Sequence, residues 1–315
     1  MSEARCLLKT EKLTRQFSGK LAVNALSFEV YQGEVLGFLG PNGAGKSTTM
    51  NMLTGNLSPD SGMVEINGID LFDQPESAKQ HLGYLPENPP LYRELTVREF
   101  LQFCGQIHGV NRKHLTTRID DTLEQCGLAT VSNRLIGQLS KGYQQRTGIA
   151  QAILHQPAVV ILDEPTSGLD PIQIQQIRQL IRHIADQHSV IVSTHILQEV
   201  EMLCDRVQIM RQGKLVFSDS LVNLQSLRQQ GAIKVRFHSP PDTMTLANLA
   251  GVTAVENLGE GYFRLQFLPD HNPTDKLVRQ SVSEDWRLMQ LIPELDSLEQ
   301  LFTQLVNQET NGDDS

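Results

Sequence analysis

The sequence predicts an α/β fold, in which a mixed sheet is packed against helices and is followed by a smaller α+β unit. A glycine-rich loop at residues 40–48 lies between a short apolar run, residues 35–39, and a helix-forming segment. Two more short apolar runs, at 158–162 and 190–192, lie between helical segments, as buried parallel strands do. The composition changes after about residue 225, which indicates a second domain.

The glycine-rich loop has the spacing G-x-x-x-x-G-K-[ST]. Glycine backbones can wrap closely around a triphosphate and point several N–H groups inward. Lys46 is placed to reach the β- and γ-phosphates, and the Ser47 hydroxyl is placed to bind Mg²⁺. A helix from Thr48 onward turns its N-terminus toward the phosphates. The loop therefore predicts a nucleoside triphosphate site made of Gly40, Pro41, Asn42, Gly43, Ala44, Gly45, Lys46, Ser47 and Thr48.

The other elements of the first 224 residues follow in order. Strands are predicted at 21–30 and 63–69, within an N-terminal antiparallel β subdomain. Thr96 and Glu99 form a capping box, and apolar residues at helical spacing follow to Ile107. A second helix is predicted at about 115–126, so residues of about 90–155 form a helical insert. Strands at 207–210 and 215–217, joined at Gln212-Gly213, close the domain as a hairpin.

The tail has the order of a ferredoxin-like domain. Strands are predicted at 232–237, 252–258, 262–268 and 286–292, and helices at 243–250, 274–283 and 295–306. We expect domains at 1–224 and 225–308, with a disordered acidic tail at 309–315. The second domain carries no catalytic motif, so a regulatory or dimerisation role is expected.

Composition excludes several classes of protein. The net charge of −9 argues against a broad nucleic-acid footprint. Four widely spaced cysteines indicate reduced thiols in a cytoplasmic protein. The N-terminus lacks the apolar core of a signal peptide, and no run of about 18 apolar residues predicts a transmembrane segment.

A second group of candidate residues follows the predicted strand at 159–162. Asp163 and Glu164 come at the carboxyl end of this strand, where open α/β sheets gather their catalytic groups. Asp163 is the candidate Mg²⁺ partner and Glu164 the candidate general base for a water molecule. Upstream, Ser140 is a plausible N-cap of a helix whose N-terminus could face an anion.

From about residue 5 to 220 the chain resembles the ATP-binding subunits of ABC transporters. Residues 40–48 match the Walker A motif, and Ile161–Pro165 match Walker B. Leu139–Arg146 match the signature, with Lys141 in place of its second-position glycine and Tyr143 in place of its glutamine. Ser167–Asp170 match the D-loop, and Ser193–His195 the switch histidine. The details look most like the exporter-type (ABC-2) subfamily, near gliding-motility-associated and multidrug-export ATPases.

The resemblance implies a P-loop ATPase that uses ATP and Mg²⁺. Phe17 is expected to stack on adenine, and Glu87 stands where the family has its Q-loop glutamine near the metal. Lys46, Glu164 and His195 are the expected catalytic residues. ATP would lie between two subunits, in a homodimer or heterodimer, where Ser140, Gly142 and Asp170 of one subunit meet nucleotide held by the other.

The resemblance also implies membrane permease subunits as partners, with no nucleic acid. The chain would be cytoplasmic, bound peripherally to the inner face of the cell membrane, and would drive export. Two alternatives remain open at this stage. One is a soluble ABC ATPase that acts on a non-transport machine, and the other is an ATP-gated regulatory dimer with little turnover.

Overall fold

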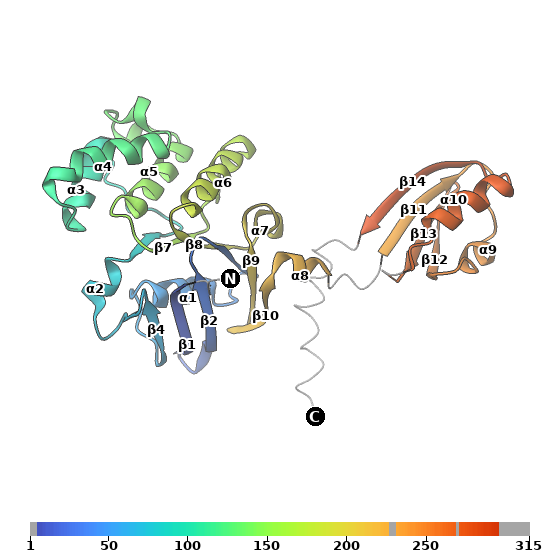
Figure 1. Cartoon of the computed structure of the whole chain (residues 1–315), viewed down its shortest axis with the longest axis horizontal. Coiled ribbons are helices and arrows are strands. Elements are labelled where there is room, and N and C mark those ends of the chain that lie inside the picture. The colour runs from blue at the N-terminus through green and yellow to red at the C-terminus, as the bar shows by residue number, and fades with distance from the viewer. Residues whose placement is uncertain (1–4, 227–230, 269–270, 296–315) are drawn as a thin grey trace. The chain divides into compact units, whose positions relative to one another are not determined.

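The computed structural model describes residues 5–226, 231–268 and 271–295 (Figure 1). The chain divides into two compact units, Met1–Leu221 and Val222–Ser315, and each is described by itself. The predicted helix at 295–306 and the predicted tail at 309–315 fall almost entirely outside the described residues; residue 295 itself ends a strand.

The first unit begins with an antiparallel sheet of order β2-β1-β4-β5. Its strands are β1 (Cys6–Phe17), β2 (Lys20–Tyr31), β4 (Ser61–Ile66) and β5 (Ile69–Asp70). The prediction of one strand at 63–69 is wrong, because Asn67 and Gly68 have φ of 51° and 82°. Two consecutive residues of positive φ turn the chain back on itself, so that Ile66 pairs with Ile69.

The central sheet of this unit has the order β10-β9-β3-β8-β7-β6. Strands β6, β7, β8, β3 and β9 run parallel, and β10 pairs antiparallel with β9 as the predicted hairpin. The sheet is therefore mixed, as expected. The bounds are β3 (Val35–Leu39), β6 (Leu82–Leu85), β7 (Val159–Asp163), β8 (Ser189–Thr194), β9 (Arg206–Arg211) and β10 (Lys214–Ser220).

Strands β3, β7 and β8 are buried along their whole length. This is why their sequences are continuous apolar runs and do not alternate. Leu39 pairs with Thr194, and Asp163 pairs with Ser193, so the carboxyl ends of the three strands are level. Residues that follow these strands consequently meet at one edge of the sheet.

Helix α1 (Lys46–Leu53) starts two residues before the predicted Thr48, directly after the glycine-rich loop. The predicted helical insert contains α3 (Val97–Ile107), α4 (Arg112–Gln125) and α5 (Lys141–Ile153), which lie together in Figure 1. The capping box of Thr96 and Glu99 is confirmed. Helix α4 starts before the predicted Leu115, because the Asn111 side chain accepts a hydrogen bond from the Lys113 N–H at 3.0 Å.

The remaining helices of the first unit are short, except for the one that follows the D-loop. They are α2 (Pro75–Lys79), α6 (Pro171–Ala185), α7 (Leu197–Leu203) and α8 (Leu221–Ser226), which crosses into the second unit. A continuous apolar core joins the N-terminal sheet, α1 and the central sheet through residues such as Leu13, Phe38 and Met50. The edge of the sheet that carries the site rests on this core.

The second unit has the predicted β-α-β-β-α-β order. Its elements are β11 (Gly231–Phe237), α9 (Thr243–Ala247), β12 (Val252–Gly259), β13 (Tyr262–Phe267), α10 (Thr274–Ser283) and β14 (Leu288–Leu295). The strands form an antiparallel sheet of order β12-β13-β11-β14, which is the ferredoxin-like arrangement. Its core includes Phe237, Leu265, Leu277 and Trp286.

Candidate functional site

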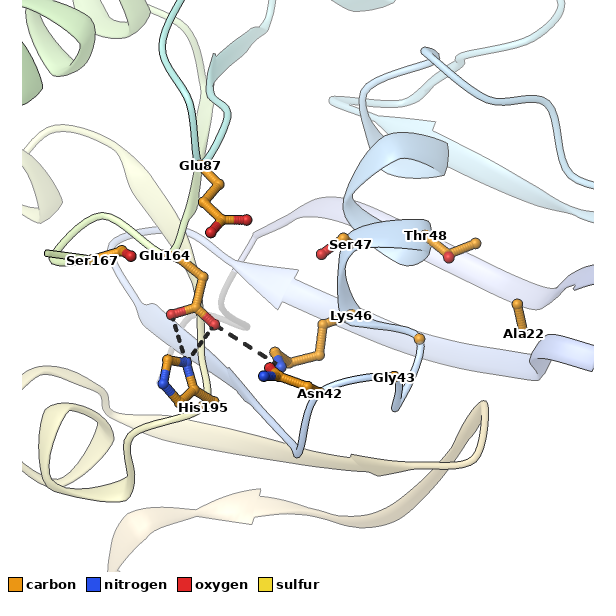
Figure 2. A pocket seen from close by; sticks show the side chains of 11 residues that line it. Ala22, Asn42, Gly43, Lys46, Ser47, Thr48, Glu87, Glu164, Ser167 and His195 are labelled. Carbon is orange, nitrogen blue, oxygen red and sulfur yellow. Dashed lines mark hydrogen bonds and ion pairs between the residues drawn. The ribbon is translucent and has the colours of Figure 1, made fainter.

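A cavity of about 270 Å³ lies at the carboxyl edge of the central sheet (Figure 2). It is formed by the glycine-rich loop and α1 on one side and by the segments that follow β6, β7 and β8 on the other. Residues far apart in the sequence therefore meet around one space. The lining residues are Ala22, Asn42, Gly43, Gly45, Lys46, Ser47, Thr48, Glu87, Glu164, Ser167 and His195.

The shape of the glycine-rich loop depends on Gly45. Its φ is 108°, a conformation that residues with a side chain rarely adopt. A Cβ added at Gly45 would also lie 2.3 Å from the Ala22 carbonyl oxygen. The loop can therefore bring its backbone N–H groups to the start of α1 only if this residue is glycine.

Lys46 holds the loop closed from inside. Its Nζ donates hydrogen bonds to the carbonyl oxygens of Gly40 at 2.7 Å and Pro41 at 3.4 Å. The side chain is 6% exposed. Burial lowers the pKa of the Lys46 ammonium, and the nearby carboxylates, first that of Glu164, oppose this shift. An anion bound in the cavity would compensate the positive charge of this buried ammonium.

Glu164 lies between Lys46 and His195 (Figure 2). The His195 Nδ1 is 2.9 Å and 3.0 Å from the two carboxylate oxygens of Glu164. An ionised carboxylate only accepts hydrogen bonds, so the proton of this contact belongs to Nδ1. The Lys46 Nζ is 4.0 Å from Glu164 Oε1. The carboxylate is thus held in one orientation at the wall of the cavity.

The backbone at Glu164 is strained, with a φ of 47°. This conformation turns the chain at the end of β7, so that Glu164 faces the cavity. Burial raises the pKa of Glu164, and the hydrogen bond from His195 opposes this shift. A carboxylate with a raised pKa is a stronger base than an ordinary one, which is the property that a general base needs.

Asp163 is 4% exposed; burial raises its pKa, and the neighbouring Ser193 hydroxyl opposes this shift. Within the described residues, its Oδ1 is buried without a hydrogen-bond partner. A buried carboxylate oxygen without a partner is costly unless a cation compensates it. The described residues contain no group of three or more His, Cys, Asp or Glu side chains that could hold a metal ion by themselves. The position therefore suits a cation that takes its other ligands from elsewhere.

Glu199 ties the segments on this side of the cavity together. It is 2% exposed and accepts hydrogen bonds from the hydroxyl of Thr194, at 2.8 Å, and from that of Thr166. Thr194 precedes His195, and Thr166 precedes Ser167. One buried carboxylate on α7 therefore fixes the positions of two cavity-lining residues.

Most of the predicted loop residues line the cavity, and so do Glu87, Glu164 and His195. Several predicted site residues do not line it: Phe17, Gly40, Pro41, Ala44, Ser140, Gly142, Asp163 and Asp170. Gly40 and Ala44 are buried within the loop itself. Asp163 stands directly before Glu164 at the end of β7.

The signature and D-loop residues cap helices outside the cavity. The Ser140 Oγ accepts a hydrogen bond from the Tyr143 N–H at 3.4 Å, at the start of α5. The Asp170 Oδ1 accepts one from the Gln173 N–H at 2.9 Å, at the start of α6. The capping residues Ser140 and Asp170 are themselves exposed, so a second molecule could reach them, whereas Gly142 in the first turn of α5 is buried.

Phe17 ends β1 and is 45% exposed. The Arg15 guanidinium lies 4.9 Å from the centre of its ring. The ring is therefore not part of the core. Phe17 pairs with Lys20 in the turn that leads to the cavity-lining Ala22.

Three residues of this region were not among the predicted site residues. Ser167 is part of the D-loop motif, and that motif was a sufficient signal to include it. Ala22 contributes from β2, and Glu199 acts through two threonine side chains. Neither has a sequence pattern that distinguishes it from an ordinary strand or helix residue.

Comparison with known proteins agrees with this geometry. Residues 23–167 match the family model described as ABC transporter. The bacitracin transport ATP-binding protein BcrA of Bacillus licheniformis is 42% identical over 212 residues, which are 67% of this chain and 68% of that protein. The uncharacterized ABC transporter ATP-binding protein YxlF of Bacillus subtilis (strain 168) is 33% identical over 305 residues, 96% of this chain and 100% of that protein.

Among solved structures, cbiO1 from Clostridium perfringens, part of the ABC transporter complex cbiONQ, is similar with a TM-score of 0.66 and 27% identity. The match covers 71% of this chain and 92% of that one. In the part of the chain that the structure describes, no helix is both long and apolar enough to cross a membrane. The chain belongs to the ATP-binding subunits of ABC transporters, the ATPases that bind and hydrolyse ATP to drive transport.

Proposed function

We propose that the chain is the Mg²⁺-dependent motor of an exporter and works as a dimer with ATP at the interface. The observation that carries this proposal is the cavity that joins Lys46 and Ser47 to Glu164 and His195. The first pair suits the binding of phosphate oxygens, and the second pair suits the activation of a water molecule beside them.

In this proposal the metal site is formed by Ser47, Asp163 and Glu87. The unpartnered Oδ1 of Asp163 supports it, since a cation would compensate that buried oxygen. When bound, Mg²⁺ would neutralise charge on the phosphate oxygens. Glu87 brings a carboxylate where the family has an amide, and it lines the same cavity as Ser47. Lys46 would exchange its bonds to Gly40 and Pro41 for phosphate oxygens.

Glu164 would take the proton from the attacking water. The burial of Glu164 and its contact with His195 support this role, because both keep the carboxylate group directed toward the cavity. His195 would hold the carboxylate in place through its Nδ1–H. Phosphoryl transfer needs positioning and charge stabilisation above all, and these residues provide both.

The signature and D-loop would complete the site of a second subunit. Ser140 and Asp170 are exposed at helix starts outside the chain's own cavity, which suits contact with ATP held by a partner, and Gly142 is buried in the first turn that Ser140 caps. Phe17 is exposed as an adenine-stacking residue must be. ATP would then favour the closed dimer, and hydrolysis would favour its opening.

The helical insert and the 87–92 loop would form the surface that meets the permease. Tyr92 and Phe103 are 50% and 40% exposed, and their ring centres are 5.5 Å apart. Ile107, on the same helix as Phe103, is 67% exposed. Exposed aromatic groups of this kind favour protein contacts. The chain would be cytoplasmic and would reach the inner face of the membrane through this contact.

The second unit would regulate or dimerise the motor. Its ferredoxin-like core is complete by itself and contains no cavity-lining residue of the site. The names of relatives concern bacitracin and multidrug transport, which supports export as the direction.

Size-exclusion chromatography with light scattering tests the dimer directly. The wild-type chain and Glu164→Gln are compared without nucleotide and with ATP and Mg²⁺. We expect ATP to convert Glu164→Gln to a lasting dimer, and the wild type to return to monomer as ATP is consumed. A mass that never responds to ATP would refute the ATP-bridged dimer.

A further inference from the structure

Lys141 departs from the family pattern at a position next to the predicted phosphate contacts. It is the first residue of α5, between the N-cap Ser140 and Gly142, where the family signature has glycine. Its side chain is exposed. Within the described parts of the chain, no hydrogen bond or ion pair is found for its ammonium, but the end of the side chain lies close to another loop.

That contact is with the D-loop. A Cβ built on Gly168 would lie 2.1 Å from the Lys141 Nζ and 3.4 Å from its Cε. The end of the lysine therefore occupies the space where any other residue at 168 would place its side chain. Gly168 also has a φ of 67°, which favours glycine. With glycine at 168, the end of the Lys141 side chain can lie against the D-loop, where a side chain at 168 would have to displace it.

Two further contacts join the same helices. The Cβ position of Gly142 is 2.9 Å from the Gln173 Oε1, and the Arg146 Nη2 donates a hydrogen bond to the Gln176 Oε1 at 2.5 Å. These contacts place the first two turns of α5 against the first two turns of α6. Lys141 extends the contact from α6 to the loop before it.

The D-loop reaches the nucleotide cavity at its other end. Ser167, the neighbour of Gly168, lines the cavity with Lys46 and Glu164. The hydroxyl of Thr166, one residue earlier, is bound to the buried Glu199. Ser167 therefore lies between Thr166, which Glu199 binds, and Gly168, which the end of Lys141 contacts.

We infer that Lys141 is a positioning residue that couples the signature turn to the D-loop. The turn that faces ATP on a second subunit and the loop that lines the chain's own cavity then move together. This rests on the proposed function, and it adds a link that glycine at position 141 could not make. The ATP held by one subunit would thereby adjust the position of Ser167 in the other subunit, beside that subunit's own ATP.

The alternative is that Lys141 is an ordinary solvated lysine at a helix start. The two differ in what Ser167 does when Lys141 is changed. A solvated lysine acts independently of Ser167, whereas a positioning residue acts through it. A double-mutant cycle separates these cases.

The test uses the full chain and measures ATP turnover against ATP concentration. The variants are Lys141→Gly, Lys141→Arg, Ser167→Ala and the double variant Lys141→Gly/Ser167→Ala. Lys113→Gly is the matched control, because Lys113 is also an exposed lysine in the first turn of a helix. Binding of a fluorescent ATP analogue to the monomer is measured in parallel.

We expect Lys141→Gly to lower kcat by roughly tenfold while nucleotide binding to the monomer is retained. Lys141→Arg should keep most of the activity, and Lys113→Gly all of it. The double variant should be no slower than the slower single variant. The inference would be overturned if the two single-variant effects on kcat multiplied in the double variant, or if Lys141→Gly kept the wild-type kcat. A wild-type chain that neither hydrolyses ATP nor dimerises would instead refute the proposed function.

Discussion

Replacing Glu164 by glutamine removes one charge from the cavity and almost no volume. The amide can still accept the hydrogen bond from the His195 Nδ1–H, which spans 2.9 Å in the native structure. The loop, α1 and the other cavity residues keep their contacts. The change therefore tests the basicity of Glu164 with little effect on the shape of the site.

The size of the effect follows from two interactions. A positioned general base contributes roughly a hundredfold to ten-thousandfold in rate, or about 3 to 5 kcal/mol of barrier. The Lys46 Nζ is 4.0 Å from Glu164 Oε1, where two charges attract by at most about 4 kcal/mol at an effective dielectric constant of about 20. Since glutamine ends this attraction, Lys46 becomes freer to bind phosphate, and ATP affinity should be retained or increased.

The assay is phosphate release at saturating ATP and Mg²⁺, with ATP affinity measured separately by fluorescence. We expect turnover to fall about a hundredfold or more with no loss of affinity. Glu201→Gln is the matched control, because it removes an exposed carboxylate on α7 and should leave turnover unchanged. Turnover of Glu164→Gln near the wild-type value would reject Glu164 as the base, and a parallel loss of affinity would show that the site had been distorted.

Three further predictions concern the same edge of the sheet. Burial already raises the pKa of Glu164, and His195→Ala removes a hydrogen bond that favours its ionised form. The acid limb of the pH profile of kcat/KM should therefore move to higher pH. If this limb does not move, the assigned contact is contradicted. Asp163→Asn should raise the free energy of unfolding of the nucleotide-free chain at pH 7 by roughly 1 to 3 kcal/mol, measured by denaturant titration, while Mg²⁺-dependent turnover is lost. The sign follows because the folded pKa of Asp163 is raised, so the stability linked to its protonation is present at low pH and is lost as the pH rises through that value. Gly45→Ala should weaken ATP binding by roughly a hundredfold. Gly19→Ala is the control and should not weaken it, because Gly19 also has a positive φ (86°) but no atom lies within 4 Å of the added Cβ. Equal ATP affinities of the two variants would refute the role of the close approach to Ala22.

The sequence was sufficient for those parts of the fold that depend on local pattern. Continuous apolar runs predicted the buried parallel strands β3, β7 and β8, and the capping box at Thr96 predicted the start of α3. The strand at 63–69 was wrong because periodicity does not show a turn when the residues on both sides are apolar. Asn67-Gly68 was the available signal, since this pair favours positive φ.

The site could be predicted where a motif carries its own chemistry. The glycine-rich loop and the carboxylates after β7 are of this kind. The tertiary contacts could not be predicted, because they join residues that no spacing relates. Glu199 binds two hydroxyl groups from different segments, and Lys141 lies against Gly168, which is nearly thirty residues later in the chain. Such contacts depend on where the helices pack, and only the three-dimensional structure gives that.

The position of the helical insert has a consequence for how such a chain can change over evolutionary time. It leaves the central sheet at the end of β6 and returns at the start of β7, and these two strands are direct neighbours. The insert is therefore a closed excursion from one edge of the sheet. The surface of α3 and α4 could be exchanged for that of a relative, with α5 and its signature turn kept, without altering the register of β3, β7 and β8. In this way the membrane partner of the ATPase could change during evolution while the catalytic edge of the sheet stayed the same. The same graft between chains could be attempted by protein engineering.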